Sequence, residues 1–157
     1  GLVKLAVIER HHATGNRGLA ILSGYIREDA RMDGAVAVTV AHDSHNLIIA
    51  GGSDADMLTA AEALRCTGGG MVVVKKGRVE ALLALPVAGL MTTETAEVFI
   101  EKQAAFYAKL RSLFDFAEGI DPVMTMAFTA LPVIPAVRLT DMGLFDVTRF
   151  AFTTVEV

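Results

Sequence analysis

The sequence contains one cysteine, no tryptophan and four prolines in 157 residues. A single cysteine, Cys66, excludes an internal disulfide, and the chain shows no signal-peptide pattern, so we expect a cytoplasmic protein. Basic clusters are sparse too: the formal net charge is −4, and none exceeds the run Lys-Lys-Gly-Arg at 75–78. This balance disfavours nucleic acid as a partner.

Long uninterrupted apolar runs are also missing, although 53% of the residues are hydrophobic and the mean hydropathy is +0.49. The longest apolar segments, 81–91 and 123–137, are interrupted by Pro86, Pro132 and Pro135. A membrane-spanning helix needs about 20 consecutive apolar residues, so we expect no contact with a membrane. The excess apolar surface instead favours a protein interface, for example in a homo-oligomer.

Strand and helix patterns alternate along the chain. Apolar runs predict strands over 4–9, 34–41, 47–50, 71–75 and 78–83, the last two forming a hairpin, while 19–26 fits a strand or a short helix. Helical spacing predicts helices from Ser53 to Gly68, from Thr92 or Thr93 to before Gly119, and over 122–130; the tail, 139–157, is expected in short strands with a turn at 141–143. This order predicts an α/β (or α+β) fold, a mixed β-sheet layered with helices, in a single compact domain over residues 1–157.

The first predicted helix has a recognisable start and one apolar face. Ser53 followed by Asp56 fits a capping box. Met57, Ala60 and Leu64 then lie on one face. Cys66 has no evident catalytic partner, and we expect it in the core, as we do the methionines and the phenylalanines on helical faces.

The most informative motif is the pentapeptide His42-Asp43-Ser44-His45-Asn46, which interrupts two apolar runs. Polar side chains between buried strands cost free energy unless each finds a partner. Such a loop therefore indicates catalysis, ligand binding or a buried hydrogen-bond network.

The loop chemistry allows several roles. His42 and His45 are weak metal-ligand candidates, because two histidines without a fixed third ligand make a poor site. The imidazoles could also polarise a carbonyl or shuttle a proton, with Asp43 orienting either ring. The alternative is a network whose five side chains stabilise the turn.

A second polar group, Glu9, Arg10, His11 and His12, ends the first predicted strand. In open α/β sheets, ligands bind beyond the carboxyl ends of the strands. Glu9, Arg10 and His11 are therefore further site candidates, whereas an ordinary surface turn suits His12 better. No hydrolytic site is complete in the sequence, which has no His-x-His, Gly-x-Ser-x-Gly or Cys-x-x-Cys pattern.

Several short and unusual sequence segments resemble, in the same order, segments of the C-terminal domain of bacterial adenine deaminases. They are Val-Ala-His-Asp-Ser-His-Asn at 40–46, Glu-Arg-His at 9–11 with Thr-Gly-Asn at 14–16, the three glycines at 68–70, Leu-Pro-Val-Ala-Gly-Leu-Met at 85–91, and the segments 121–125, 130–135 and 139–144. The resemblance covers nearly the whole chain.

The resemblance implies a part of an amidohydrolase that converts adenine to hypoxanthine and ammonia. In such proteins a divalent metal, Mn or Fe, lies in a (β/α)8 barrel that precedes this domain, and a bound metal pair generates hydroxide. The barrel ligands have no counterpart here. The partners implied are therefore the missing barrel and adenine, and the loop 42–46, with Glu9, Arg10 and His11, is expected to face the active site without a defined catalytic role.

Two other functions remain open from the sequence. The domain could be a structural or assembly module whose loop is internal scaffolding, or an independent small-ligand binding domain. A barrel sequence upstream would favour the adenine deaminase domain over an independent ligand-binding domain. Substitution of the loop in the full-length protein would distinguish the adenine deaminase domain from an assembly module.

Overall fold

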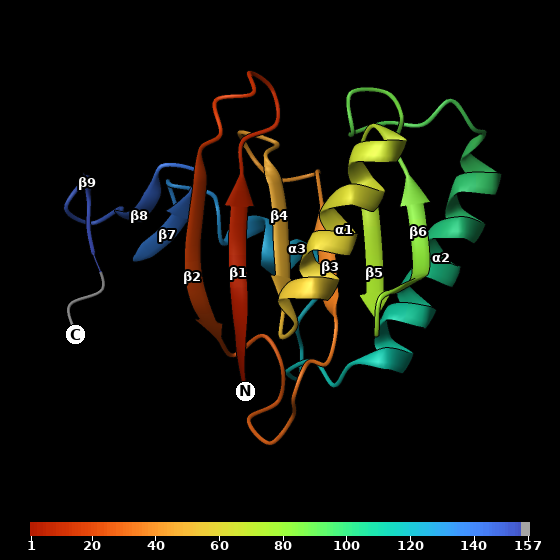
Figure 1. Cartoon of the computed structure of the whole chain (residues 1–157), viewed down its shortest axis with the longest axis horizontal. Helices are drawn as coiled ribbons and strands as arrows, with labels where there is room; N and C mark the ends of the chain where they lie inside the picture. The colour runs from red at the N-terminus through yellow and green to blue at the C-terminus, as the bar shows by residue number, and fades with distance from the viewer. Residues whose placement is uncertain (155–157) are drawn as a thin grey trace.

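The computed structural model, which describes residues 1–154, is built around a six-stranded sheet with helices on both faces (Figure 1). A three-stranded sheet lies beside it. The elements, in chain order, are β1 (Leu2–Ile8), β2 (Arg17–Ser23), β3 (Ala35–Val38), β4 (Leu47–Gly51), α1 (Asp54–Thr67), β5 (Gly70–Lys75), β6 (Arg78–Ala84), α2 (Ala96–Leu113), α3 (Pro122–Phe128), β7 (Val137–Thr140), β8 (Gly143–Asp146) and β9 (Ala151–Phe152).

The main sheet has the strand order β2-β1-β4-β3-β5-β6, and every pair in it is antiparallel. The layered α/β class is thus confirmed, but the expectation of a mixed sheet is wrong. The reason is that consecutive strands pair as hairpins, which short connections permit only for antiparallel strands. The segment 19–26, ambiguous from sequence, belongs mainly to strand β2, which pairs with β1.

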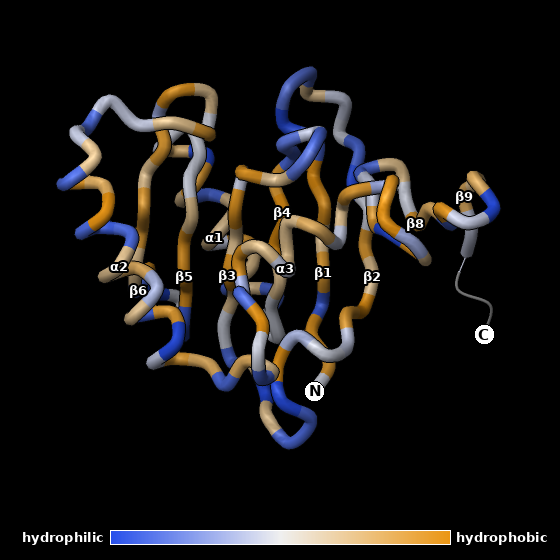
Figure 2. The backbone as a smooth tube through the Cα atoms, turned by 180° about the vertical axis from the view of Figure 1, so that it is seen from behind, coloured by the Kyte–Doolittle hydropathy of each residue, from blue (hydrophilic) through white to orange (hydrophobic). Residues whose placement is uncertain are grey.

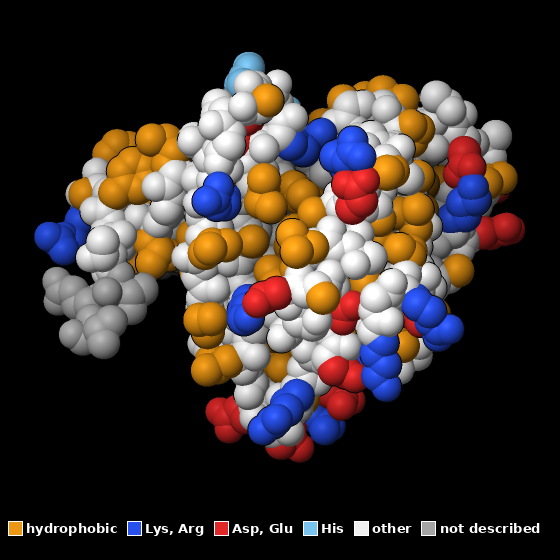
Figure 3. All heavy atoms as spheres, in the orientation of Figure 1, with side chains coloured by type: hydrophobic (Ala, Val, Ile, Leu, Met, Phe, Trp, Pro, Cys, Tyr) orange, Lys and Arg blue, Asp and Glu red, His pale blue; other side chains and the backbone are white. Residues whose placement is uncertain are grey.

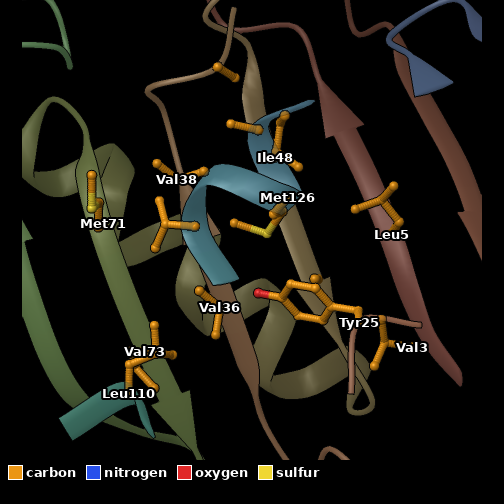
Figure 4. Close-up of a cluster of buried hydrophobic side chains, with 14 of the residues drawn as sticks. Val3, Leu5, Tyr25, Val36, Val38, Ile48, Met71, Val73, Leu110 and Met126 are labelled. Atoms are coloured by element: carbon orange, nitrogen blue, oxygen red, sulfur yellow. The ribbon is translucent and has the colours of Figure 1, made fainter. Parts of the chain in front are cut away.

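Helix α1 covers one face of the sheet, and α2 and α3 lie on the other (Figures 1 and 2). The alternation of side chains along each strand divides the core accordingly. Ala35 and Ala37 of β3 face α1, and their small side chains allow the helix to pack closely. Val36 and Val38 face the other way, into a larger core that holds Met126 of α3 (Figure 4).

The start of α1 follows the predicted capping pattern only in part. The Ser53 hydroxyl accepts a hydrogen bond from the Asp56 N–H, as an N-cap should. The Asp56 carboxylate does not return to Ser53; it is buried and accepts hydrogen bonds from the N–H groups of Lys76 and Gly77. Asp56 therefore fastens the β5–β6 turn to the helix.

Several sequence expectations are corrected in detail. Cys66 is exposed, and its thiol donates to Glu62, because it lies on the solvent side of α1, opposite the buried Leu64. Helix α2 begins at Ala96 with Thr95 as N-cap, since Thr92 accepts from the Glu94 N–H in a preceding turn. Some methionines are also exposed, including Met142 in the β7–β8 turn. The last three residues of the predicted tail lie outside the described residues.

No helix in the described part of the chain is both long and apolar enough to cross a membrane. Strands β1 and β2 lie beyond the edge of α1 (Figure 1), and apolar side chains there are exposed. Leu2, Leu19, Ile21 and Leu58 are all more than 60% exposed. Isolated apolar side chains are normal on a surface, but a contiguous patch indicates an interface.

Because this patch is bare, we expect the 157-residue chain to self-associate in solution. Sedimentation velocity over a wide concentration range would measure it. Leu19→Glu should weaken the association, whereas Met142→Glu, a matched change at another exposed apolar residue, should not. A strictly monomeric chain that binds no hydrophobic dye would contradict this expectation.

Candidate functional site

The loops that carry the candidate residues meet at one end of the main sheet. Strand β1 ends at Ile8, which pairs with Leu47 at the start of β4. The loop 9–16 after β1 therefore lies beside the loop 39–46 that joins β3 to β4. The turn before β5 and the loop after β6 reach the same end, because Val38 at the end of β3 pairs with Met71, and the neighbouring Gly70 pairs with Ala84.

Arg10 and His11 join the two candidate groups directly. The Arg10 Nε donates to the His45 carbonyl oxygen at 2.7 Å, and its Nη2 donates to the Ala88 carbonyl oxygen at 2.7 Å. The His11 Nε2 lies 2.8 Å from the Ser44 carbonyl oxygen, and it must donate because a carbonyl only accepts. Partial burial lowers the pKa of Arg10, but the guanidinium stays charged. The histidine loop is thus fastened by side chains from the β1–β2 loop.

Glu9 forms hydrogen bonds within its own loop and is not available to bind a ligand. Its carboxylate accepts hydrogen bonds from the Thr14 N–H and hydroxyl, and from the N–H groups of His11 and His12. These bonds, the Thr14 N–H first, lower the pKa of Glu9 to about 2. A carboxylate that is so easily ionised is a poor general base near neutral pH, so Glu9 holds the shape of the loop that positions Arg10.

His45 is held as a neutral imidazole. Its backbone has φ of +51°, and its Nδ1 accepts a hydrogen bond from the Ala41 N–H at 3.3 Å. Burial, and then the charges of His42 and Arg10, lower the pKa of His45, while Asp43 partly offsets this effect. A neutral ring that accepts at Nδ1 carries its proton on Nε2. His45 can therefore offer one directed hydrogen-bond donor.

His42 lies beside His45 but faces the opposite side of the sheet from α1. The centroids of the two rings are 5.7 Å apart, and the His42 ring lies 6.3 Å from Phe128 of α3. Asp43 and Ser44 are exposed. Among residues 1–154 the Asp43 carboxylate accepts no hydrogen bond from either ring, so the idea that it orients an imidazole is not supported by the geometry.

Asn46 behaves as a structural residue. Its side chain is buried and its Nδ2 donates to Asp141 Oδ1 at 3.2 Å, while Asn16 Nδ2 donates to Asp141 Oδ2 at 3.2 Å. Asp141, in the β7–β8 turn, therefore ties both loops to the small sheet. Sequence analysis placed Asp141 in a turn but missed this role. The one signal was that Asp141 lies in the segment 139–144, which resembles the adenine deaminase family.

Thr39 is a second residue that sequence analysis missed. It is buried just after β3, where its Oγ1 donates to the Gly89 carbonyl oxygen at 2.7 Å and accepts from the Gly70 N–H at 2.8 Å. The only signal was a hydroxyl within an apolar run. Thr39 links the loop after β6 to the end of the sheet, next to Arg10.

A cleft of about 890 Å³ opens between α1 and the β1–β2 loop. Ile8, Leu47 and Leu64 give it an apolar lining, and Arg10 and His11 contribute polar groups. The lining includes the candidates from the first loop but not His42 or His45. Arg10 therefore stands between the cleft and the histidine loop, in contact with both.

Within residues 1–154, no three histidine, cysteine or carboxylate side chains lie close enough together to hold a metal ion. Together with the other residues of 1–154, His42 and His45 thus do not form a metal centre. What the loop can do chemically is donate and accept hydrogen bonds through the neutral imidazole of His45, the ring of His42 and the exposed Ser44 hydroxyl.

A family model described as "Adenine deaminase C-terminal domain" matches residues 1–151. The chain belongs to this family. An adenine deaminase of Nitratidesulfovibrio vulgaris is 53% identical over 157 residues, which are all of this chain and 27% of that protein. An adenine deaminase 2 of Desulfotalea psychrophila is 44% identical over 155 residues, or 99% of the chain and 26% of the relative. This adenine deaminase C-terminal domain thus spans about a quarter of the length of these relatives.

Proposed function

We propose that this domain is the C-terminal part of an adenine deaminase, a hydrolase in which water replaces the amine of adenine to give hypoxanthine and ammonia. The family match and the names of the relatives support this proposal. The role is in purine salvage, in the cytoplasm of the cell, where the single thiol fits a reducing setting. We further propose a homo-oligomer, in keeping with exposed apolar side chains outside the β1–β2 patch, such as Val133 and Phe150.

The metal, Mn or Fe, is proposed to lie in a barrel domain that precedes residue 1. Residues 1–154 do not fit a metal centre, and no reaction step is assigned to a metal on this chain. The contribution of the domain is therefore sought in binding, orientation and exclusion of water at the mouth of the active site.

The histidine loop is proposed to face the substrate. The observation that carries this is the state of His45, whose Nδ1 accepts from the Ala41 N–H and whose pKa is lowered, so that Nε2–H is a fixed donor. A purine presents ring nitrogens that accept hydrogen bonds, and the hydrogen bonds from Arg10 and His11 hold the loop backbone in place. Donors that are already oriented lose little entropy when substrate binds.

A test is His45→Asn in the full-length protein. The asparagine oxygen can take the place of Nδ1 and accept from Ala41, and asparagine tolerates positive φ, but the Nε2 donor is lost. We expect kcat/KM for adenine to fall about tenfold or more, which is about 1.4 kcal/mol of transition-state stabilisation, with little change in melting temperature. His42→Gln tests the exposed neighbour in the same way.

The control is His45→Ala, which also removes the acceptor for Ala41 and should therefore lower stability in addition. The competing function is an assembly module, favoured by the bonds that the loop makes within the domain, such as Asn46 to Asp141. If His45→Asn leaves kcat/KM near that of the unmodified enzyme while His45→Ala lowers only the melting temperature, the assembly module is the better assignment. Loss of metal along with activity would place an imidazole among the ligands of the barrel.

A further inference from the structure

One apolar surface of the domain has no cover in the described residues. Leu2 is 67% exposed, Leu19 68%, Ile21 63% and Leu58 72%. Figure 3 shows apolar side chains gathered on this side, over β1, β2 and the adjoining part of α1. We call the four residues and the adjacent cleft the docking face.

Strand register places the sheet residues of this set on one side. Leu19 pairs with Ala6, and Ile21 pairs with Lys4. The Lys4 Nζ lies 2.8 Å from Asp54 Oδ1 at the start of α1, so these side chains share the α1 face. Helix α1 itself packs over β3, β4, β5 and β6, which leaves β1 and β2 beyond its edge (Figure 1).

The opposite side of the same two strands is covered. Strands β7 and β8 pack against β2, and Leu139 of β7 is buried there. The approach is so close that a Cβ on Gly18 would lie 1.9 Å from the Thr140 carbonyl oxygen. One face of β1 and β2 is therefore covered by the small sheet, whereas apolar side chains on their other face are exposed.

The cleft connects the bare surface to the histidine loop. Leu58 and Ile8 line it from α1 and β1, and Arg10 borders it at the end of the sheet. Arg10 in turn donates to the His45 carbonyl oxygen. An apolar side chain that entered the cleft would thus rest against the residue that positions the loop.

We propose that the docking face is covered by the polypeptide that precedes this domain in the full-length protein, with an apolar side chain of that polypeptide seated in the cleft. The inference rests on the proposed function, and it names the surface through which the domain packs. The matched segment is only 27% of the Nitratidesulfovibrio vulgaris relative, so most of such a protein lies outside the domain. That remainder would join β1 next to Leu2, which belongs to the face.

Docking on this face would bury apolar area and would also bring the preceding polypeptide close to the histidine loop. The face lies beside α1, and the histidine loop lies at the end of the sheet where the cleft opens. If the preceding polypeptide covers the docking face and extends to this end of the sheet, it would contact His45. The loop would not need to move, because Arg10 and His11 already hold its backbone.

The test measures thiol labelling in the full-length protein. Leu58→Cys and Leu19→Cys are made in a Cys66→Ser background, and labelling by N-ethylmaleimide at each position is read by peptide mass spectrometry. The matched control is Met142→Cys, which is 69% exposed on the small sheet. We expect the first two to react at least tenfold more slowly than the control under native conditions, and all three equally in urea.

A photoreactive maleimide attached to Leu58→Cys then identifies the polypeptide that covers the docking face. A mixture of ¹⁴N and ¹⁵N protein distinguishes crosslinks within one molecule from crosslinks between two copies. Adducts on peptides preceding residue 1 support the proposal. Labelling as fast as at Met142, or adducts on residues 1–154 of a second copy, would overturn it. Activity is measured on the same variants and on His45→Asn. An accessible Leu58 together with a His45→Asn defect would reject the docking face and leave the proposed function intact.

Discussion

The isolated 157-residue chain is expected to release no ammonia from adenine, even with excess Mn(II) or Fe(II). The reason is that water needs activation to attack the purine carbon, and in the proposed enzyme a metal of the preceding barrel supplies it. Residues 1–154 bring together no group of metal ligands. The loss relative to the full-length enzyme, which should turn over at about 1 per second or more, is the largest effect expected here.

An ammonia-coupled assay on pure chain measures this, with the full-length protein as the positive control in the same buffer and metal. Adding the isolated chain to a barrel fragment is a useful extension, since restored turnover would show that the domain acts by association. Turnover near the full-length rate by the chain alone would reject the assignment of the chemistry to a preceding barrel.

The sequence predicted the elements more securely than their arrangement. The face of α1 that holds Met57 and Leu64 followed from helical spacing, and both are buried. The antiparallel order of the sheet did not follow, because pairing between β1 and β4 joins strands that are remote in sequence and depends on packing. The start of α2 was placed too early, since two threonines before Thr95 also fit a cap.

The sequence predicted the candidate site as two separate groups, residues 9–11 and the loop 42–46, and did not show that they form one structure. Sequence placed Arg10 and His45 on different loops, and only the pairing of β1 with β4 brings the Arg10 Nε within 2.7 Å of the His45 carbonyl oxygen. The role of Asp56 shows the limit of motif reasoning. A capping box was expected from the spacing of Ser53 and Asp56. The buried Asp56 carboxylate instead accepts hydrogen bonds from the N–H groups of Lys76 and Gly77, in a turn about twenty residues away.

The glycine run at the start of β5 gives the largest expected effect on stability. Gly70 has φ of +136°, and a Cβ there would lie 2.1 Å from the Leu83 carbonyl oxygen. Real side-chain carbons do not approach a backbone oxygen so closely, so β5 and β6 would have to separate. Backbone strain costs about 1–3 kcal/mol, and overpacking about 1–3 kcal/mol more. We therefore expect Gly70→Ala to destabilise the domain by about 2–6 kcal/mol.

The neighbouring Gly68 is the matched control. It also has positive φ, +79°, as the left-handed cap of α1, but a Cβ there would come no nearer than 3.6 Å to another atom. Gly68→Ala should therefore cost only the conformational strain of about 1–2 kcal/mol. Urea unfolding of dilute chain, followed by circular dichroism, compares the two. Equal midpoints for both variants would mean that β5 and β6 do not approach as closely as Gly70 requires.

Gly70→Ala should also disturb the site, because the Gly70 N–H donates to Thr39 Oγ1, which in turn holds the Gly89 carbonyl oxygen beside Arg10. Thr39→Val removes that hydroxyl without adding a Cβ clash and isolates this link. It leaves buried polar groups unpaired, a loss of about 1–3 kcal/mol. If the end of the sheet positions the histidine loop, both variants of the full-length protein lose kcat/KM at temperatures where they remain folded, whereas Gly68→Ala keeps it.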